Sequence, residues 1–419
     1  MTQIIFQNTV TTGTAMTLAS VEDGYITAGV LVASTTGTGV LGAGLNHSMT
    51  VGGNVYGANF GMSLGGNANT DTDITVNILQ GGTVFSHVRA IQILANNSFV
   101  VNNGQIAADY AGVLMTGNGG SGSGVTNFGA IQGTYFGILH EASSEHFRLK
   151  NFGTLTGESG GYYATGSSVD EIINRGTIVG DVVLGSGADR YDGRGGTVNG
   201  TIYGQGDSDT FICGLGEETI DGGLGIDLLD FSRAASITVS LANDLAGTRT
   251  AEGDFYSAIE NVLGSRGNDR IVGDGAANRL EGVLGNDRLE GGVGHDSLVG
   301  GLGVDTLTGG VGLDHFIFNA LAESGDAITE FTPGNGAGDI LELNAASFGG
   351  GLVPGALNPA TFVVRADHLA QTSAQRFIFD TTDKTLWFDA NGSLNGGLTM
   401  VCDMQDNAAV MSSLDILLI

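Results

Sequence analysis

Six contiguous nine-residue repeats fill residues 264–317, and no other feature of this 419-residue chain constrains its fold as strongly. Each follows the pattern G-G-x-G-x-D-x-U-x, where U is a large apolar residue, and three of the six match at every fixed position. One complete and three imperfect copies lie within 184–230. Tandem repeats this short predict a solenoid in which two nonapeptides form one flattened turn and the U residues are buried. In the contiguous block the U residues are Ile271, Leu280, Leu289, Leu298, Leu307 and Phe316.

The sixth position of the nonapeptide indicates what the repeats bind. Ca²⁺ is a hard cation that takes about six to eight oxygen ligands, which a Gly-rich turn can supply as backbone carbonyls and one carboxylate. Glu218 replaces Asp in the degenerate copy at 213–221, so its reach to an ion stays open. The candidate calcium ligands are Asp189, Asp209, Asp227, Asp269, Asn278, Asp287, Asp296, Asp305 and Asp314.

Successive repeats should place these ligands on alternate edges of the solenoid, because two nonapeptides make one turn. We expect Asp269, Asp287 and Asp305 on one edge, and Asn278 with the other two acids on the opposite edge. Ions between neighbouring loops then number about four in 264–317, with one or more in 184–230. The gap at Asn278 should be weakest because an amide carries no charge. Without ions, carboxylates about 5 Å apart repel one another, so binding and folding should be coupled.

A longer repeat fills the first part of the chain. A motif close to Asn-x-Gly-x-Ile/Leu-x-Gly recurs, with Asn102, Asn127, Asn151 and Asn174 at equivalent positions. A period of about 20–29 residues between short β-branched runs fits one coil of a parallel β-helix. The Gly should allow a left-handed corner, and the four Asn should stack into an internal ladder. A Gly/Asn-rich β-sandwich is the alternative interpretation.

The two kinds of repeat predict an all-β protein, a parallel β-helix or β-solenoid that continues into a calcium-binding parallel β-roll with a β-rich C-terminal cap. The predicted β-helix covers 1–183. The β-roll covers 184–317, including a spacer at 231–263. The cap covers 318–419.

The charge of the chain is strongly negative and unevenly distributed. It has 44 acidic and 15 basic residues, a net charge of −29, and only six of these charged residues precede residue 140. Such a balance disfavours nucleic acids and anionic membrane surfaces and favours cations. The sequence contains no apolar run of membrane-spanning length, and its start lacks the pattern of a signal peptide. Cys213 and Cys402 do not form a disulfide framework, and an intermolecular bond from either stays open.

The nonapeptides resemble those of the repeats-in-toxin family of secreted bacterial calcium-binding proteins. Residues 227–275 are similar to the family's spacer, 315–343 to the segment that caps the last roll, and 376–392 to its terminal β-hairpins. The resemblance covers roughly 184–419 and ends in an apolar tail, SSLDILLI. It implies folding on extracellular Ca²⁺, type I secretion through an uncleaved C-terminal signal, and an extracellular or cell-surface location. It does not fix an activity, because these repeats accompany toxins, enzymes, adhesins and surface-layer proteins.

The family's enzymes leave few traces in the first 180 residues. HEASSEH at 140–146 spaces its histidines too widely for a zinc-protease helix, and GMSLG at 61–65 lacks the helix of a lipase elbow. One dense ionisable cluster in 135–150 could provide acid–base pairs for a uronate sugar, and a polar loop is the alternative interpretation. The cluster comprises Tyr135, His140, Glu141, Glu145, His146, Arg148 and Lys150.

We therefore expect no catalytic residues and a structural or adhesive role. The sparsely charged front can pack against copies of itself, which favours calcium-dependent self-assembly into a matrix, filament or surface layer. Cell-surface polysaccharide is a second possible partner. The alternative function is a polysaccharide lyase or epimerase built on the front β-helix. Carbohydrate or ice binding by a flat Thr/Asn face is a weaker idea, because the front coils show only scattered Thr.

Overall fold

The computed structural model describes residues 2–419 except for 20–21, 45, 67–70, 118–121, 143–145, 215–216, 243–252, 335–337, 393–395 and 406–409. Its contacts divide the chain into two compact units. Unit one comprises Met1–Asp227 with Asp254–Ala258, and unit two comprises Leu228–Gly253 with Ile259–Ile419. The three-part division expected from the sequence follows repeat type rather than packing, and it stays a prediction.

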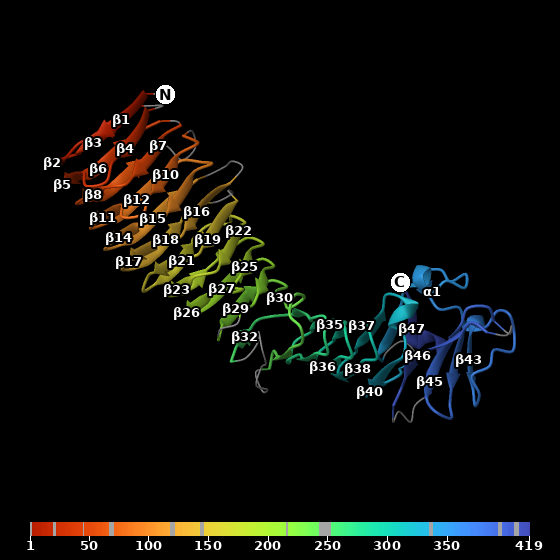
Figure 1. Cartoon of the computed structure of the whole chain (residues 1–419). Helices are drawn as coiled ribbons and strands as arrows, with labels where there is room; N and C mark the ends of the chain where they lie inside the picture. The colour runs from red at the N-terminus through yellow and green to blue at the C-terminus, as the bar shows by residue number, and fades with distance from the viewer. Residues whose placement is uncertain are drawn as a thin grey trace. The chain divides into compact units, whose positions relative to one another are not determined.

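Unit one is a stack of coils in which each coil up to β26 contributes one strand to each of three parallel sheets (Figure 1). The first sheet is formed by β1 (Thr2–Phe6), β4 (Glu22–Ile26), β7 (Ser48–Val51), β10 (Thr75–Ile78), β13 (Phe99–Asn102), β16 (Ser123–Asn127), β19 (Phe147–Asn151), β22 (Asp170–Asn174), β25 (Arg190–Asp192) and β28 (Thr210–Ile212). The second sheet is formed by β2 (Thr9–Thr11), β5 (Leu31–Ser34), β8 (Asn54–Gly57), β11 (Thr83–Ser86), β14 (Gln105–Ala108), β17 (Ala130–Gly133), β20 (Thr154–Thr156), β23 (Thr177–Val179) and β26 (Thr197–Asn199). The third sheet is formed by β3 (Met16–Leu18), β6 (Thr38–Gly42), β9 (Phe60–Leu64), β12 (Arg89–Leu94), β15 (Ala111–Thr116), β18 (Phe136–His140), β21 (Gly160–Ala164), β24 (Val182–Val183), β27 (Thr201–Gly206), β29 (Thr219–Leu224) and β32 (Phe255–Ser257).

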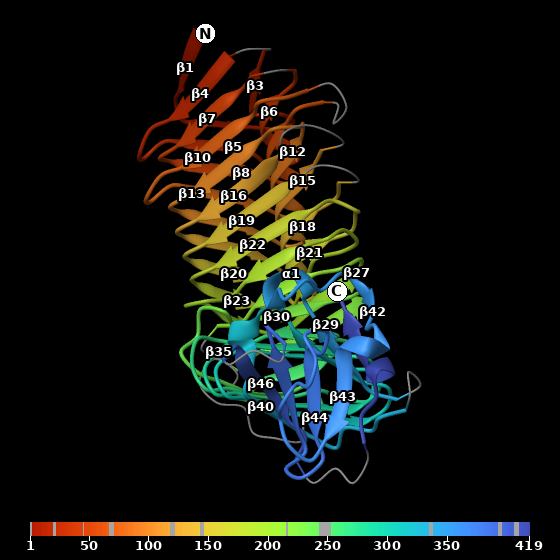
Figure 2. The ribbon, with the colours of Figure 1, turned by 90° about the vertical axis from the view of Figure 1, so that its right-hand side faces the viewer.

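The coils stack in register because equivalent residues of successive repeats pair. Val84 pairs with Ile106 and Ile106 with Ile131 in the second sheet, and each is about 1% exposed. Neighbouring residues along a strand face opposite sides, so these apolar side chains fill the interior while their neighbours face outward. Figure 2 shows the first-sheet strands β4 to β22 as a regular row. The parallel β-helix predicted from the longer repeat is confirmed.

The asparagines of the longer repeat form the predicted ladder inside this stack. The Asn102 side-chain amide donates to the Asn127 side-chain oxygen at 2.8 Å, Asn127 to Asn151 at 2.9 Å, and Asn151 to Asn174 at 2.9 Å. Each amide also donates to a backbone carbonyl of the next coil, and all four residues are fully buried. The ladder needs no external partner, because every rung supplies a donor and an acceptor.

The prediction of a left-handed corner at the neighbouring glycines was wrong. Gly104, Gly129, Gly153 and Gly176 are absent from the positions with positive φ. A Cβ at Gly129 would instead lie 2.1 Å from the Gly104 carbonyl oxygen, and one at Gly153 would lie 2.0 Å from that of Gly129. The corner requires Gly because the backbones of successive coils approach each other too closely for any side chain.

Unit two contains the nonapeptide roll, in which two sheets face each other; the strands of the repeats pair parallel, whereas β44, β45 and β46 at the end of one sheet pair antiparallel. One sheet comprises β30 (Leu228–Asp230), β33 (Asn261–Leu263), β35 (Arg279–Leu284), β37 (Ser297–Leu302), β39 (His315–Phe318), β41 (Ile340–Leu343) and β47 (Ile416–Leu418), with β42 (Gly355–Ala356) antiparallel to β47. The other comprises β31 (Thr238–Ser240), β34 (Arg270–Val272), β36 (Arg288–Val293), β38 (Thr306–Val311), β40 (Asp326–Thr329) and β46 (Leu398–Asp403), followed by β45 (Thr385–Asp389), β44 (Phe377–Asp380) and β43 (Phe362–Arg365). One short helix, α1 (Ala345–Phe348), and 3-10 turns at Leu321–Glu323, Pro359–Thr361 and Ser413–Asp415 are the helical elements described.

The register of the roll confirms that two nonapeptides make one turn. Arg270 pairs with Arg288 and Arg288 with Thr306, so neighbouring strands of one sheet are 18 residues apart. All six U residues of the contiguous block are completely buried, as predicted. The β-roll is therefore present, and its loops lie at the two edges where the sixth-position residues occur.

Candidate calcium sites

The sixth-position acids are tied together along each edge of the roll by backbone hydrogen bonds. On one edge the Asp269 N–H donates to Asp287 Oδ1 at 2.7 Å, and the Asp287 N–H donates to Asp305 Oδ1 at 2.7 Å. On the other edge the Asn278 N–H donates to Asp296 Oδ1 at 2.8 Å, and the Asp296 N–H donates to Asp314 Oδ1 at 2.9 Å. The structure thus brings these six residues together in the two predicted groups.

The same arrangement recurs in unit one. The Asp189 N–H donates to Asp209 Oδ1 at 2.8 Å, and the Asp209 N–H donates to Asp227 Oδ1 at 2.7 Å. All three residues are at most 2% exposed. We call these three series of linked carboxylates the Asp ladders.

The ladder bonds use only one oxygen of each carboxylate. The other oxygen, Oδ2, is buried and has no hydrogen-bond partner among the described residues at Asp189, Asp209, Asp287, Asp296, Asp305 and Asp314. The Asp287 Oδ2 atom faces Gly282, the first glycine of the same repeat. A Cβ on Gly282 would lie only 2.2 Å from this oxygen. Gly300 stands in the same relation to Asp305, at 2.3 Å. A buried acceptor without a donor is costly, and a hard cation is the partner that satisfies it, so these residues fit Ca²⁺.

The electrostatics of the ladders favour a cation. Burial, reinforced by neighbouring carboxylates, raises the pKa of Asp189 to about 9 and that of Asp287 to about 7. Burial raises the pKa of Asp209 to about 7 and that of Asp296 to about 6, and a ladder neighbour, Asp227 or Asp314, adds to the shift. A bound divalent cation would lower these pKa values, because it stabilises the ionised form of each ligand.

The first residues of the two roll ladders differ from the rest. Both oxygens of Asp269 accept hydrogen bonds, Oδ2 from the Ser265 N–H at 2.5 Å and Oδ1 from the Ile237 N–H at 2.8 Å. The Asn278 Oδ1 accepts from the Asp274 N–H at 2.9 Å, and its amide donates to the Glu260 carbonyl at 3.4 Å. The side-chain oxygens of these two residues already accept hydrogen bonds, so they are less available to an ion than those of the acids that follow them.

Sequence reasoning missed three further acids that extend the ladders. The Asp305 N–H donates to Asp326 Oδ1 and the Asp314 N–H to Asp339 Oδ1, both at 2.9 Å, while the Asp170 N–H donates to Asp189 Oδ1 at 2.7 Å. The glycine frame of the nonapeptide is absent around all three. A reduced signal remains, because each is followed two residues later by a buried apolar residue, as in D-x-U.

The ionisable cluster predicted from 135–150 is not assembled at one place. His140 is buried inside unit one, 3.3 Å from the Tyr162 hydroxyl, which donates to Asp170 at 2.6 Å. Arg148 projects from the outer side of β19 and pairs with Glu171 at 2.5 Å. The remaining members are dispersed: Tyr135 is 50% exposed between β17 and β18, Lys150 lies beside Arg148 on β19, Glu141 and His146 are exposed, and Glu145 lies outside the described residues.

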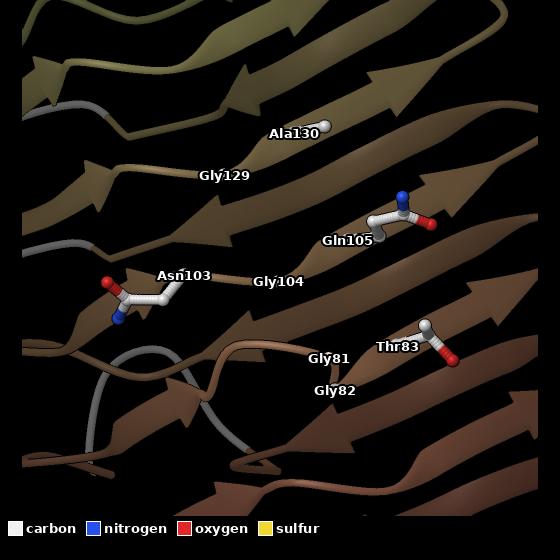
Figure 3. A pocket seen from close by; sticks show the side chains of 8 residues that line it. All are labelled: Gly81, Gly82, Thr83, Asn103, Gly104, Gln105, Gly129 and Ala130. Carbon is white, nitrogen blue, oxygen red and sulfur yellow. The ribbon is translucent and has the colours of Figure 1, made fainter.

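A shallow groove of about 410 Å³ lies at the corner between the first and second sheets of unit one (Figure 3). Its lining is mostly glycine backbone, with Thr83, Asn103 and Gln105 as the polar side chains. None of its lining residues can titrate, so this groove brings no acid–base pair to a substrate.

The fold and the ladders define the class: this is a parallel β-solenoid with stacked loop carboxylates suited to calcium. The family model described as the RTX calcium-binding nonapeptide repeat (4 copies) matches the chain at residues 194–229, 257–289 and 281–316. These matches confirm the predicted resemblance of the nonapeptide region to the repeats-in-toxin family. No curated protein matches it. None of the helices described is long and apolar enough to cross a membrane.

Proposed function

We propose that this chain is a secreted structural protein whose roll folds on calcium and whose front coils then pack against other copies. The observation that carries the calcium step is the series of buried Oδ2 atoms without donors in the Asp ladders. Asp209, Asp287, Asp296, Asp305 and Asp314 are the acids that would hold the ions, together with loop carbonyls. Type I export and a location in an extracellular matrix or surface layer belong to the same proposal.

One outer face of unit one supports the self-assembly step. Every outward side chain of strands β8, β11, β14, β17, β20, β23 and β26 is uncharged, and we call this surface the neutral face. The outer side of the first sheet, by contrast, carries Arg148, Lys150 and Glu171. The neutral face comprises Asn54, Tyr56, Thr83, Phe85, Gln105, Ala107, Ala130, Gln132, Thr154, Thr156, Thr177, Val179, Thr197 and Asn199.

A second copy is the partner that this face suits best. The chain carries a net charge of −29, most of it after residue 139, so two copies repel one another chiefly through that part of the chain. That repulsion is smallest where no charge is present. The seven strands span about 30 Å at the usual strand spacing, which offers a flat area for face-to-face packing.

Size-exclusion chromatography with light scattering tests the proposal, in EGTA and in about 5 mM Ca²⁺, an excess for extracellular sites. We expect a calcium-dependent shift from an expanded monomer to an assembly. The double variant Gln132→Glu/Thr154→Glu should reduce assembly, because it places like charges on the neutral face. The matched control Asn77→Glu/Thr126→Glu adds the same charge on the first sheet and should assemble like the parent.

A compact monomer in calcium would contradict self-assembly and would favour the alternative function, a polysaccharide lyase or epimerase. That alternative predicts product from uronate polysaccharides, with activity lost on His146→Ala or Arg148→Ala. Dispersal of the 135–150 cluster makes it the less favoured function.

A further inference from the structure

A thiol and two carboxylates meet inside unit one, away from the oxygen-only Asp ladders. The Sγ atom of Cys213 and one carboxylate oxygen each of Glu218 and Asp254 all lie within 4.8 Å of one another. Cys213 follows β28, Glu218 precedes β29, and Asp254 precedes β32. Cys213 and Glu218 are 3% and 2% exposed, and Asp254 is partly buried.

Two departures from the nonapeptide consensus create this cluster. In the copy at 213–221, Cys213 occupies the position of the first glycine and Glu218 that of the sixth-position Asp. A glycine and an aspartate would have given an ordinary loop of the roll. Both departures direct a ligand-type side chain to the same interior point.

Hydrogen bonds hold the two carboxylates in place but do not neutralise them. Glu218 accepts from the Gly214 N–H at 2.9 Å, and the Glu218 N–H donates to Asp254 Oδ1 at 2.8 Å. The Tyr256 hydroxyl donates to the other Asp254 oxygen at 2.6 Å and lies 3.9 Å from the Cys213 sulfur. Among the described residues, neither carboxylate has an ion pair with Arg, Lys or His.

A fourth polar group faces the same space. Tyr191 is completely buried, and its hydroxyl forms no hydrogen bond within 3.5 Å among the described residues, although the Asn174 side chain lies nearby. A Cβ placed on Gly193 would lie 2.7 Å from Glu218 Oε1 and 3.0 Å from the Tyr191 hydroxyl oxygen. Glu218 and Tyr191 therefore border one small space that glycine keeps open, and the buried hydroxyl there has no hydrogen bond within 3.5 Å among the described residues.

We propose that Cys213, Glu218 and Asp254 bind a borderline transition-metal cation of the Zn²⁺ class, with the Tyr191 hydroxyl beside the fourth position. Thiolate and carboxylate ligands suit such an ion, whereas calcium takes oxygen ligands alone. In a tetrahedral zinc site the ligand atoms lie roughly 3.3–3.8 Å apart, which the observed cluster reaches with small side-chain adjustments. The site would tie Asp254–Ala258, which follows a long excursion of the chain into unit two, to the coil that contains Cys213.

Cobalt titration of the full-length chain in excess calcium tests this site, because calcium occupies the oxygen-only sites and Co²⁺ reports thiolate ligation. We expect a thiolate-to-cobalt charge-transfer band that saturates at about one Co²⁺ per chain and disappears on addition of Zn²⁺. Cys213→Ser should abolish the band. Cys402→Ser is the matched control, since Cys402 is also buried, and it should leave the band unchanged.

Glu218→Gln provides a second, nearly isosteric test and should weaken Co²⁺ binding at least about tenfold. Absence of the band, or a band that survives in Cys213→Ser, would overturn the proposal. If Cys213→Ser fails to fold, as judged by far-ultraviolet circular dichroism in calcium, Glu218→Gln decides, and an unchanged Co²⁺ affinity overturns the site. Assembly in calcium is a separate readout, so failure of the metal site leaves the proposed function untouched.

Discussion

The front coils and the nonapeptide roll solve the same structural problem with side chains that differ by one atom. Each links a short polar residue in one coil to the equivalent residue in the next, but the ladder Asn residues end strands such as β22, whereas the ladder Asp residues precede strands such as β25. In the front coils the Asn side chain donates to the next Asn and to a backbone carbonyl, so the ladder is closed. In the roll the Asp carboxylate can only accept hydrogen bonds. At Asp305 one oxygen accepts from a backbone N–H, and the other has no hydrogen-bond donor among the described residues.

This comparison shows how a solenoid becomes dependent on a metal. An Asp side chain lacks the amide donor of Asn and carries a charge when ionised. The cation then supplies what the amide supplied in the front coils. We therefore expect the two ladders to respond in opposite ways to the same perturbation.

Calcium removal should produce the largest difference between the two regions. In EGTA the stacked carboxylates of the roll repel one another, so β35 to β39 should lose most of their amide protection. Strands β13 to β22 of the front coils should keep theirs. Hydrogen exchange followed by mass spectrometry, with and without Ca²⁺, measures both regions in one sample. Equal loss in the two regions would contradict the comparison.

Introducing a carboxylate into the Asn ladder should have the next largest effect. Asn127→Asp removes the donor to Asn151 and Thr154 and buries a charge, which should cost about 3 kcal/mol of unfolding free energy. Denaturant unfolding in calcium measures the change. Thr126→Asp adds the same charge on the outer side of the strand and should cost much less. An Asn127→Asp protein as stable as the Thr126→Asp control would break the argument.

The reciprocal change in the roll should weaken calcium binding without unfolding the front coils. Asp305→Asn removes the carboxylate charge while keeping the oxygen that accepts from the Asp287 N–H, and we expect about a tenfold or greater loss in calcium affinity at the adjacent gaps. Isothermal titration calorimetry measures it. Glu281→Gln is the control, because it alters only an exposed pair with Arg279, and its binding curve should match that of the parent.

Acidification should separate roll stability from calcium affinity. Burial first, with nearby carboxylates adding to it, raises the pKa of Asp326 to about 8, and that of Asp287 to about 7, above the unfolded value near 4. The folded metal-free roll thus binds protons more tightly than the unfolded chain, and its stability should rise as pH falls from about 8 toward 4. Calcium must displace those protons, so its affinity should fall over the same window. Calcium titrations that do not change between pH 8 and 6 would refute this.

The smallest expected effect is at the outer surface. Arg148→Met removes an exposed ion pair with Glu171, and such pairs contribute less than about 1 kcal/mol. Thermal unfolding should detect a change of at most a few degrees. A large loss of stability would mean that the outer charges of the first sheet support the coils more than their exposure indicates.

Sequence periodicity predicted most of the fold because the repeats encode it directly. The 18-residue register of the roll, its buried U residues and the Asn ladder all follow from spacing alone. The corner glycines were misinterpreted because a close approach between two coils, such as that of Gly129 to Gly104, involves residues far apart in sequence. Asp326 and Asp339 were missed because the ladders continue by backbone geometry after the glycine pattern has ended.

The dispersal of the 135–150 cluster has a simple physical reason. Ionisable residues that are close in sequence suggested a common site, but His140 lies on β18 and Arg148 on β19, and neighbouring side chains along a strand face opposite sides. His140 therefore lies in the interior, whereas Arg148 and Lys150 face outward. Density of ionisable residues in the sequence does not predict proximity in a solenoid, where residues one coil apart are the true neighbours.

The closed Asn ladder has a consequence for how such a chain can change its length. The rungs at Asn102, Asn127 and Asn151 each donate to the next Asn and to a backbone carbonyl, so duplication or deletion of one whole coil leaves every amide with a partner. An insertion or deletion of a few residues would shift the register and leave a buried amide without a hydrogen-bond partner. Length variation in this region should therefore occur in modules of one coil, which makes the ladder a template for growth by internal duplication.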